Sequence, residues 1–240
     1  MQTPHWLTPF SLAFRAAIEP LLAVTGRRRV ACFDADGTVW SDDIGEAFLR
    51  WLVAGGHVGG GRSVDAVWDD YEARVEANQC EGYGWAVALM AGLAEADVSL
   101  WARQMAAAWP NYRPAMVDLM RGLEAAGVEV WWVSASHRWI VRAAAQRIGV
   151  GVDRVLGVTV PVVDGILGSE VVQPMTCRAG KAAAIAKWIG VAPDLVFGDS
   201  RGDLEMMEAA AAALVTTRGD RPDSAFVVSA EARGWPVQRF

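Results

Sequence analysis

The stretch Val30-Ala31-Cys32-Phe33-Asp34-Ala35-Asp36-Gly37-Thr38 changes abruptly from apolar residues to aspartates and a glycine. An apolar run that ends in a polar, glycine-containing loop predicts a short buried strand followed by a turn. In open α/β sheets, ligands bind beyond the carboxyl ends of the strands. Asp34 and Asp36 are therefore expected to face a binding crevice.

Beyond residue 110, helical and strand patterns alternate along the chain. Helices are expected at residues 115–126, 139–148, 181–189 and 204–212, strands at 128–133, 195–197 and 213–215, and a hairpin within 158–172. This alternation predicts an α/β fold with a doubly wound parallel sheet, a Rossmann-like core. Strands ending at Asp34, Ser134 and Asp199 should bring these three residues to one crevice.

The region between these two parts has a different pattern. Residues 44–110 contain long helical stretches, such as 63–77 and 97–108, and no convincing strand. We therefore expect a catalytic core formed by residues 1–43 and 111–240, with residues 1–28 as an N-terminal helical extension. The helical insert at 44–110 is expected to form a separate cap.

Composition narrows the possible partners. With 53% hydrophobic and 21% charged residues, the chain has the balance of a soluble globular protein. A net charge of -6 without a long basic run argues against nucleic acid as a partner, and no apolar run approaches the roughly 20 residues that span a bilayer.

The three cysteines are widely spaced and odd in number: Cys32, Cys80 and Cys177. Neither a disulfide framework nor a zinc site is therefore expected. A cytoplasmic location, without a signal peptide, is the simplest expectation.

Four sequence motifs resemble those of the haloacid dehalogenase superfamily. They are Phe33-Asp34-Ala35-Asp36-Gly37-Thr38-Val39, Val133-Ser134-Ala135-Ser136, Lys181 within Gly180-Lys181-Ala182, and Gly198-Asp199-Ser200-Arg201-Gly202-Asp203. They occur in the family's order, three at predicted strand ends and the Lys181 motif at a following helix, and cover the chain from Val30 to about Thr216. The roughly 100-residue gap between the first two motifs resembles the branch with a helical cap inserted there.

The resemblance implies a phosphatase that uses Mg²⁺ and a covalent phospho-aspartate. Asp34 would attack phosphorus, and Asp36 would protonate the leaving alcohol and then deprotonate the attacking water. Lys181 would balance charge at the nucleophile and the phosphoryl oxygens. Ser134 and the backbone around Ala135 would hold the remaining phosphate oxygens.

The metal would take oxygen ligands from the same motifs, since Mg²⁺ prefers carboxylates, waters and phosphate oxygens. Asp34 and Asp199 would supply carboxylates, and the resemblance adds the backbone carbonyl of Asp36. Asp203 would orient a metal-bound water or Lys181 from behind.

The likeness within the branch is greatest to phosphoserine phosphatase and the related phosphocholine and phosphoethanolamine phosphatases. In phosphoserine phosphatases an acidic residue nine positions after the nucleophile meets the substrate's amino group, and Asp43 holds that position here; it could equally cap the helix that follows. Among the 12 tryptophans, Trp40 is the best candidate for an aromatic cage around a cation, although most should fill the core. Gly37 and Gly202 depart from phosphoserine phosphatase and favour an amine phosphate without a carboxylate.

Other functions remain open at this stage. Intact Asp36 and Asp199 argue against a dehalogenase. A broad-specificity phosphatase or a phosphotransferase of the same fold would carry the same motifs. A non-catalytic sensor of phosphorylated metabolites would be expected to have lost one of them. The partner is expected to be a small phosphate monoester, and the protein a monomer or homodimer.

Overall fold

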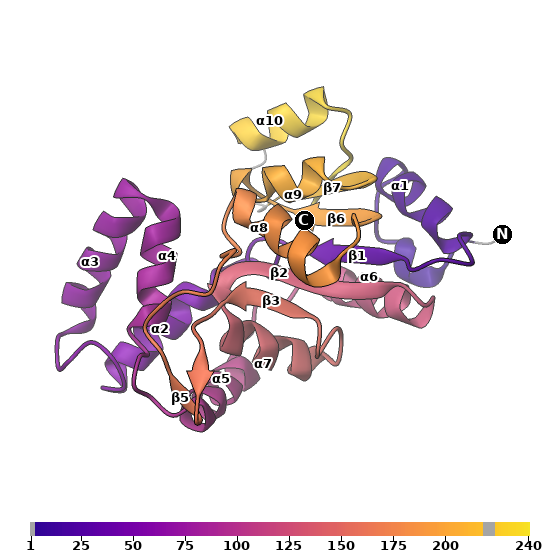
Figure 1. Ribbon diagram of the computed structural model, residues 1–240. Helices are drawn as coiled ribbons and strands as arrows, with labels where there is room; N and C mark the ends of the chain where they lie inside the picture. Colours follow the sequence, from indigo (N-terminus) through magenta and orange to yellow (C-terminus); the bar gives the residue numbers. More distant parts are fainter. Residues whose placement is uncertain (1–2, 218–223) are drawn as a thin grey trace.

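The computed structural model describes residues 3–217 and 224–240. Its centre is a six-stranded, wholly parallel sheet (Figure 1) with the strand order β3-β2-β1-β6-β7-β8. The strands are β1 (Val30–Phe33), β2 (Glu129–His137), β3 (Val155–Val158), β6 (Leu195–Gly198), β7 (Ala212–Thr217) and β8 (Val237–Arg239). The expected α/β fold with a doubly wound parallel sheet is confirmed.

Both faces of the sheet are buried, which explains why its strands are continuously apolar in sequence. Within β1, Ala31 and Phe33 point into one apolar cluster and Val30 and Cys32 into the other. The first cluster includes α1 (Leu12–Leu22), α6 (Pro114–Ala125) and α7 (Arg138–Ile148). The second includes the turn of π-helix at Ile185–Ile189 that continues α8 (Ala179–Ala184), together with α9 (Leu204–Glu208) and α10 (Ala225–Ala232).

Four further helices are inserted between β1 and β2. These inserted helices are α2 (Ile44–Ala54), α3 (Val64–Ala77), α4 (Gln79–Ala88) and α5 (Glu95–Ala108). In Figure 1, α3 and α4 stand away from the sheet, whereas α5 packs against α7. The segments that lead into and out of the insertion are paired, because Arg113 N donates to Val39 O at 2.8 Å and Ser41 N donates to Asn111 O at 3.1 Å.

Several elements differ from the sequence expectation in extent. Strand β2 continues past Ser134 to His137, with an irregular register beside β3. The expected hairpin is the short pair β4 (Val162–Val163) and β5 (Ile166–Leu167), which turns at Asp164 and Gly165 with positive φ at both. Helices α4 and α10 and strands β3 and β8 were not expected from the sequence. Their apolar residues lack a clear helical or alternating pattern.

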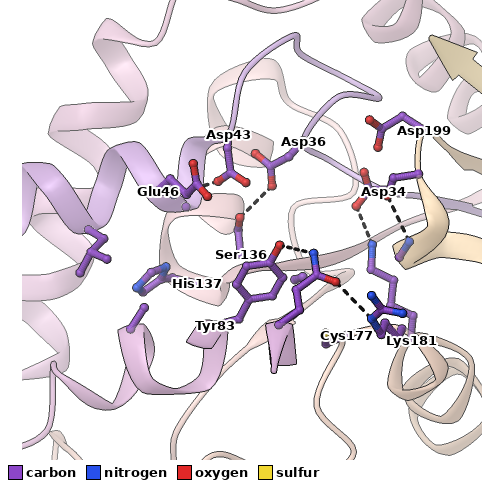
Figure 2. Close-up of a pocket in the computed structure, with 18 of the residues that line it drawn as sticks. Asp34, Asp36, Asp43, Glu46, Tyr83, Ser136, His137, Cys177, Lys181 and Asp199 are labelled. Atoms are coloured by element: carbon purple, nitrogen blue, oxygen red, sulfur yellow. Dashed lines mark hydrogen bonds and ion pairs between the residues drawn. The ribbon is translucent and has the colours of Figure 1, made fainter. Parts of the chain in front are cut away.

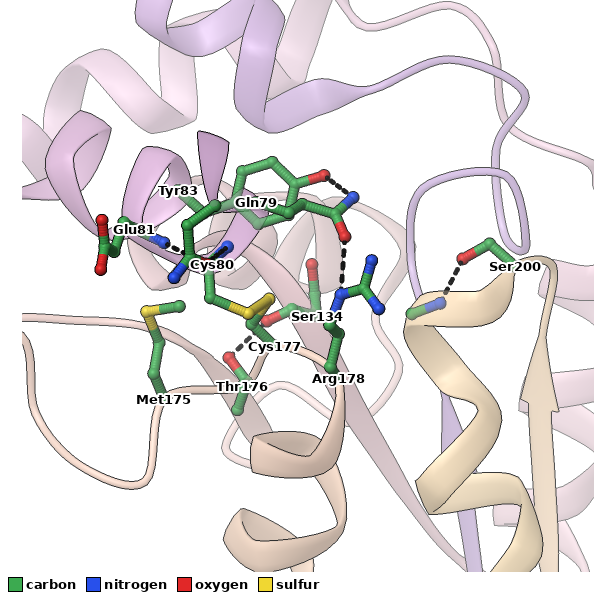
Figure 3. The surroundings of a disulfide bond; sticks show 12 residues. Gln79, Cys80, Glu81, Tyr83, Ser134, Met175, Thr176, Cys177, Arg178 and Ser200 are labelled. Carbon is green, nitrogen blue, oxygen red and sulfur yellow. Dashed lines mark hydrogen bonds between the residues drawn. A yellow bond between two sulfur atoms is a disulfide. The ribbon is translucent and has the colours of Figure 1, made fainter. Parts of the chain in front are cut away.

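The cysteine expectation is wrong. Cys80, in the first turn of α4, forms a disulfide with Cys177, which precedes α8 (Figure 3), and Cys32 is buried and free. The partners are 97 residues apart, so their pairing depends on how the inserted helices fold back onto the core. None of the described helices is long and apolar enough to cross a membrane.

Candidate active site

Residues from three neighbouring strands meet at the carboxyl edge of the sheet. Asp34 follows β1, Ala135 and Ser136 lie near the end of β2, and Asp199 follows β6. All four line one cavity, whose opposite wall comes from the inserted helices. Since β1 pairs with both β2 and β6, the parallel sheet itself places these strand ends side by side.

Lys181 forms a buried ion-pair cluster at the base of this cavity. Its Nζ lies 2.7 Å from Asp34 Oδ1 and 2.6 Å from Asp203 Oδ1 (Figure 2 shows the Asp34 contact). All three residues are at most 5% exposed. Burial by itself would lower the pKa of Lys181, but the charges of Asp203 and Asp34 outweigh burial and raise it. Lys181 therefore stays protonated and can balance charge at the Asp34 carboxylate.

Asp203 shapes the loop that carries Asp199. Its Oδ2 accepts hydrogen bonds from the backbone N–H groups of Asp199 and Ser200, each at 3.1 Å. The Ser200 hydroxyl in turn accepts from Gly202 N, which completes a capping box. Both carboxylate oxygens of Asp203 are thus engaged, one with Lys181 and one with the loop.

Asp36 is held by three donors beside the nucleophile position. Its Oδ1 accepts from Trp40 Nε1 and from Ile44 N, each at 2.7 Å, and its Oδ2 accepts from Ser136 Oγ at 2.7 Å. These bonds turn the carboxylate toward the start of α2 and the end of β2, as the Asp36–Ser136 contact in Figure 2 shows. Asp36 therefore has a defined orientation without a ligand.

The structure corrects the expectation for Trp40. Its side chain is fully buried, packs on Trp132 and Tyr112, and donates to Asp36. It cannot form a cage around a substrate cation, because it does not reach the cavity surface. The position of Trp40 after the first motif did not reveal the direction of its side chain. The ring turns into the core beneath Asp36.

Burial perturbs both aspartates of the first motif. The pKa of Asp34 is raised to about 7 by burial and by the charge of Asp203, against the opposing effect of Lys181. The pKa of Asp36 is also raised to about 7, by burial and by the charge of Asp43, although its three donors lower it. A carboxyl group with such a pKa can both donate and accept a proton near neutrality.

Ser134 lies deeper than expected for a phosphate contact. It is fully buried, its Oγ accepts from Ser136 N at 3.0 Å, and the same hydroxyl lies 3.5 Å from Asp36 Oδ2. Ala135 and Ser136 face the cavity instead. Ser136 packs so closely on Gly45 that a Cβ at position 45 would lie 2.3 Å from the Ser136 hydroxyl oxygen.

An acidic and aromatic wall faces these groups across the cavity. Asp43 caps α2 by accepting from Glu46 N at 2.8 Å, and it also lines the cavity. Glu46 accepts from the hydroxyl of buried Tyr71 at 3.2 Å, and Tyr83 lies nearby. Figure 2 shows Asp43, Glu46 and Tyr83 on the side away from Asp34 and Lys181. Burial and the charge of Asp43 raise the pKa of Tyr83 to about 12, so its hydroxyl stays protonated.

The inserted helices and the core also meet through Gln79 and Arg178. Arg178 Nε donates to Gln79 Oε1 at 3.1 Å, and Gln79 Nε2 donates to the Tyr83 hydroxyl at 2.7 Å. Arg178 has a φ of 50°, which is unusual for a residue with a side chain. The sequence did not predict five residues of this wall, because no local motif marks them: Glu46, Tyr71, Gln79, Tyr83 and Arg178.

The carboxylates fit a hard divalent cation. Single oxygens of Asp34, Asp199 and Asp203 lie within 4.8 Å of one another. Such an all-oxygen donor set matches the preference of Mg²⁺.

This geometry can be compared with known proteins. The haloacid dehalogenase-like hydrolase family matches residues 31–208, most of the chain. The protein belongs to this family. The match spans all four motifs, and Asp34, Asp36, Lys181 and Asp199 line one cavity.

Proteins similar to this chain include phosphoserine phosphatases. A phosphoserine phosphatase of Mycobacterium tuberculosis is 28% identical over 188 residues, which is 76% of this chain and 42% of the relative. The chain thus matches about two fifths of that relative's length. A Bordetella pertussis protein of unknown function has a similar structure, with a TM-score of 0.76, 22% identity, and coverage of 88% and 98% of the two chains. A substrate-bound phosphoserine phosphatase gives a TM-score of 0.55 at 16% identity, with coverage of 85% and 91%.

Proposed function

We propose that this protein is a magnesium-dependent phosphatase that hydrolyses a small phosphate monoester through an aspartyl-phosphate on Asp34. The observation that carries the proposal is the buried Lys181, paired with Asp34 at 2.7 Å and with Asp203 at 2.6 Å, beside a separately held Asp36. A purely structural ion-pair cluster would not need the further carboxyl group of Asp36, held next to it and facing the same cavity.

Asp34 is placed to act as the nucleophile. Lys181 binds its Oδ1, so Oδ2 is the oxygen left to attack phosphorus; it has only a long 3.3 Å contact with the Thr38 hydroxyl. The P–O bond to the leaving alcohol breaks as the Asp34–phosphorus bond forms. Lys181 then stabilises the negative charge on the phosphoryl oxygens.

Asp36 is proposed to transfer the protons. With its pKa raised to about 7, it can enter the reaction protonated and donate to the leaving oxygen. Once ionised, it can take a proton from the water that hydrolyses the aspartyl-phosphate. Ser136 Oγ, at 2.7 Å, would keep the carboxyl group oriented through both steps.

Mg²⁺ would be held by the carboxylates of Asp34 and Asp199 and by the carbonyl of Asp36, with Asp203 orienting the loop behind them. When bound, the ion supplies positive charge that lets an anionic carboxylate approach an anionic phosphate. Ala135 and Ser136, with Ser134 beneath them, are the proposed phosphate-binding segment.

The substrate is proposed to be an amine phosphate of the phosphocholine, phosphoethanolamine or phosphoserine type. Asp43 and Glu46 give the distal wall negative charge, and Tyr71 and Tyr83 give it aromatic surface. Carboxylates and aromatic faces both attract ammonium groups. Arg178 lines the same cavity and is the candidate contact for a carboxylate, if the substrate carries one.

We further propose that residues 44–110 act as a cap over the core formed by 1–43 and 111–240. The support is that the insertion supplies one wall of the cavity and is joined to the core by paired segments. The cytoplasmic location and the monomeric or dimeric state stay predictions.

Phosphate release from phosphocholine, phosphoethanolamine and phosphoserine, with and without Mg²⁺, tests the proposal. We expect turnover of an amine phosphate, lost by roughly 10³-fold or more in Asp34→Asn and unchanged in Asp164→Asn, an exposed hairpin aspartate. Undiminished turnover in Asp34→Asn would contradict the nucleophile. In Arg178→Gln, loss confined to phosphoserine would assign this residue to a substrate carboxylate.

A further inference from the structure

The Cys80–Cys177 disulfide joins the inserted helices to the core at the cavity wall. Cys80 lies in the first turn of α4, whereas Cys177 lies four residues before Lys181, and their Cα atoms are 5.7 Å apart. The adjacent residues Gln79 and Arg178 are hydrogen-bonded across the same boundary (Figure 3). This boundary is therefore held by one covalent bond and one hydrogen bond side by side.

The disulfide lies in the wall of a cavity that is small for the proposed substrate. The cavity has a volume of about 90 Å³, well below the roughly 300–1,000 Å³ of pockets that hold small molecules. Movement of the inserted helices away from the core would enlarge the cavity for a phosphate ester. Such movement would occur at the paired segments around Val39 and Arg113, where the insertion begins and ends, whereas the disulfide ties the middle of the insertion to the core at Cys80.

The disulfide is also reachable from outside the cavity. A second, open groove of about 610 Å³ is lined by Cys80 and Cys177, together with Trp85 and Met175. Cys80 is half-buried, whereas Cys177 is buried and also lines the site cavity. The disulfide thus forms part of the partition between the groove and the site. A small thiol in the groove could attack Cys80 Sγ without entering the site.

We propose that Cys80–Cys177 is a reversible thiol–disulfide exchange site that controls opening of the inserted helices over the cavity. A thiolate of a small dithiol attacks Cys80 Sγ, the disulfide bond breaks, and Cys177 leaves as a thiolate that takes a proton from water. The second thiol of the dithiol then attacks the first sulfur of the dithiol, which is bound to Cys80 Sγ in the mixed disulfide, and Cys80 is released. The dithiol is oxidised by two electrons to a cyclic disulfide, and a small-molecule disulfide reverses the sequence.

Reduction is expected to release the insertion and increase access to the site. The effect on activity rests on the proposed phosphatase function, but the redox site itself does not. The experiment therefore needs one readout for the thiols, one for movement and one for turnover. Cys80→Ser serves as the permanently open variant, and Cys32→Ser as the matched control, because Cys32 is buried within β1 and unpaired.

The test starts from air-oxidised protein, treated under native conditions with dithiothreitol and then with oxidised glutathione. We expect two thiols to appear and disappear reversibly, with faster hydrogen–deuterium exchange at residues 39–43 and 109–114 in the reduced form. Turnover of p-nitrophenyl phosphate should rise about 5-fold or more on reduction. Cys32→Ser should respond in the same way, and Cys80→Ser should be insensitive to both reagents.

A disulfide that dithiothreitol reduces only in denatured protein would overturn the proposal, as would reduction that leaves exchange at both paired segments unchanged. If neither form hydrolyses p-nitrophenyl phosphate or any of the three amine phosphates, the phosphatase proposal fails on its own. Thiol counting and hydrogen exchange would still decide whether the redox site operates.

Discussion

Replacing Lys181 with methionine tests the buried charge cluster most directly. Lys181 is 3% exposed and is paired with Asp34 and Asp203, which are 5% and 1% exposed. Methionine keeps most of the side-chain volume but removes the ammonium group. Two carboxylates then remain buried without the cation that balances them.

The expected cost follows from this burial. Removing one partner of a buried ion pair costs about 3–5 kcal/mol, because an uncompensated charge stays behind. For a chain of this size, 1 kcal/mol lowers the melting temperature by about 2–4 °C, so the loss should be roughly 6–20 °C. The loss should be greatest above pH 7, where Asp34 is ionised, and should shrink toward pH 5 as Asp34 takes a proton.

Urea denaturation and thermal melting at pH 7.5 and pH 5.5, without Mg²⁺, measure this effect. The chain has only two lysines, and the second, Lys187, provides the matched control. It is exposed and donates to the Gln173 carbonyl oxygen at 2.9 Å, so Lys187→Met should change stability by no more than about 0.5 kcal/mol.

The reasoning is refuted if Lys181→Met destabilises no more than Lys187→Met at pH 7.5. It is also refuted if the loss is as large at pH 5.5 as at pH 7.5, since protonation of Asp34 should relieve the excess negative charge. Either result would mean that Lys181 does not compensate the buried carboxylates.

Three further predictions concern stability. The folded-state pKa values of Asp34 and Asp36, about 7, exceed their unfolded values of about 3.9, so the folded state binds more protons between pH 4 and 7. The melting temperature of metal-free protein should therefore fall as pH rises through this range, and Mg²⁺ should stabilise more at pH 7.5 than at pH 5; a flat profile would contradict the raised pKa values. Gly45→Ala should cost about 1–3 kcal/mol in urea denaturation, because its Cβ would lie 2.3 Å from Ser136 Oγ; an unchanged midpoint would show that Ser136 moves freely. Cys80→Ser should be about 2–4 kcal/mol less stable than oxidised protein, a difference that a dithiol should abolish.

Local sequence was sufficient for the four central strands of the sheet and for placing Asp34 and Asp199 at strand ends. The apolar runs that become β1 and β6 are followed directly by Asp34 and Asp199, and the parallel arrangement brings such strand ends together. These features depend on short-range patterns, which a single chain displays without any knowledge of its partners in space. The placement of Lys181 beside Asp34 was expected only from the family resemblance, since the two residues are 147 positions apart.

The far wall of the cavity was outside the reach of sequence alone. Glu46, Tyr71 and Tyr83 come from three different inserted helices, and only the packing of those helices selects the side chains that face Asp36. Residue type alone was misleading for Trp40, which is turned into the core.

Hydrophobic periodicity and strand-end motifs therefore determined the α/β class, the position of the helical insertion and the identity of the residues around Asp34. Only the tertiary structure decided which side chains form the distal wall, and that Cys80 and Cys177 join the insertion to the core. The physical reason is distance along the chain. Secondary structure depends on neighbours a few residues apart, whereas a contact across 97 residues depends on the packing of every element between them.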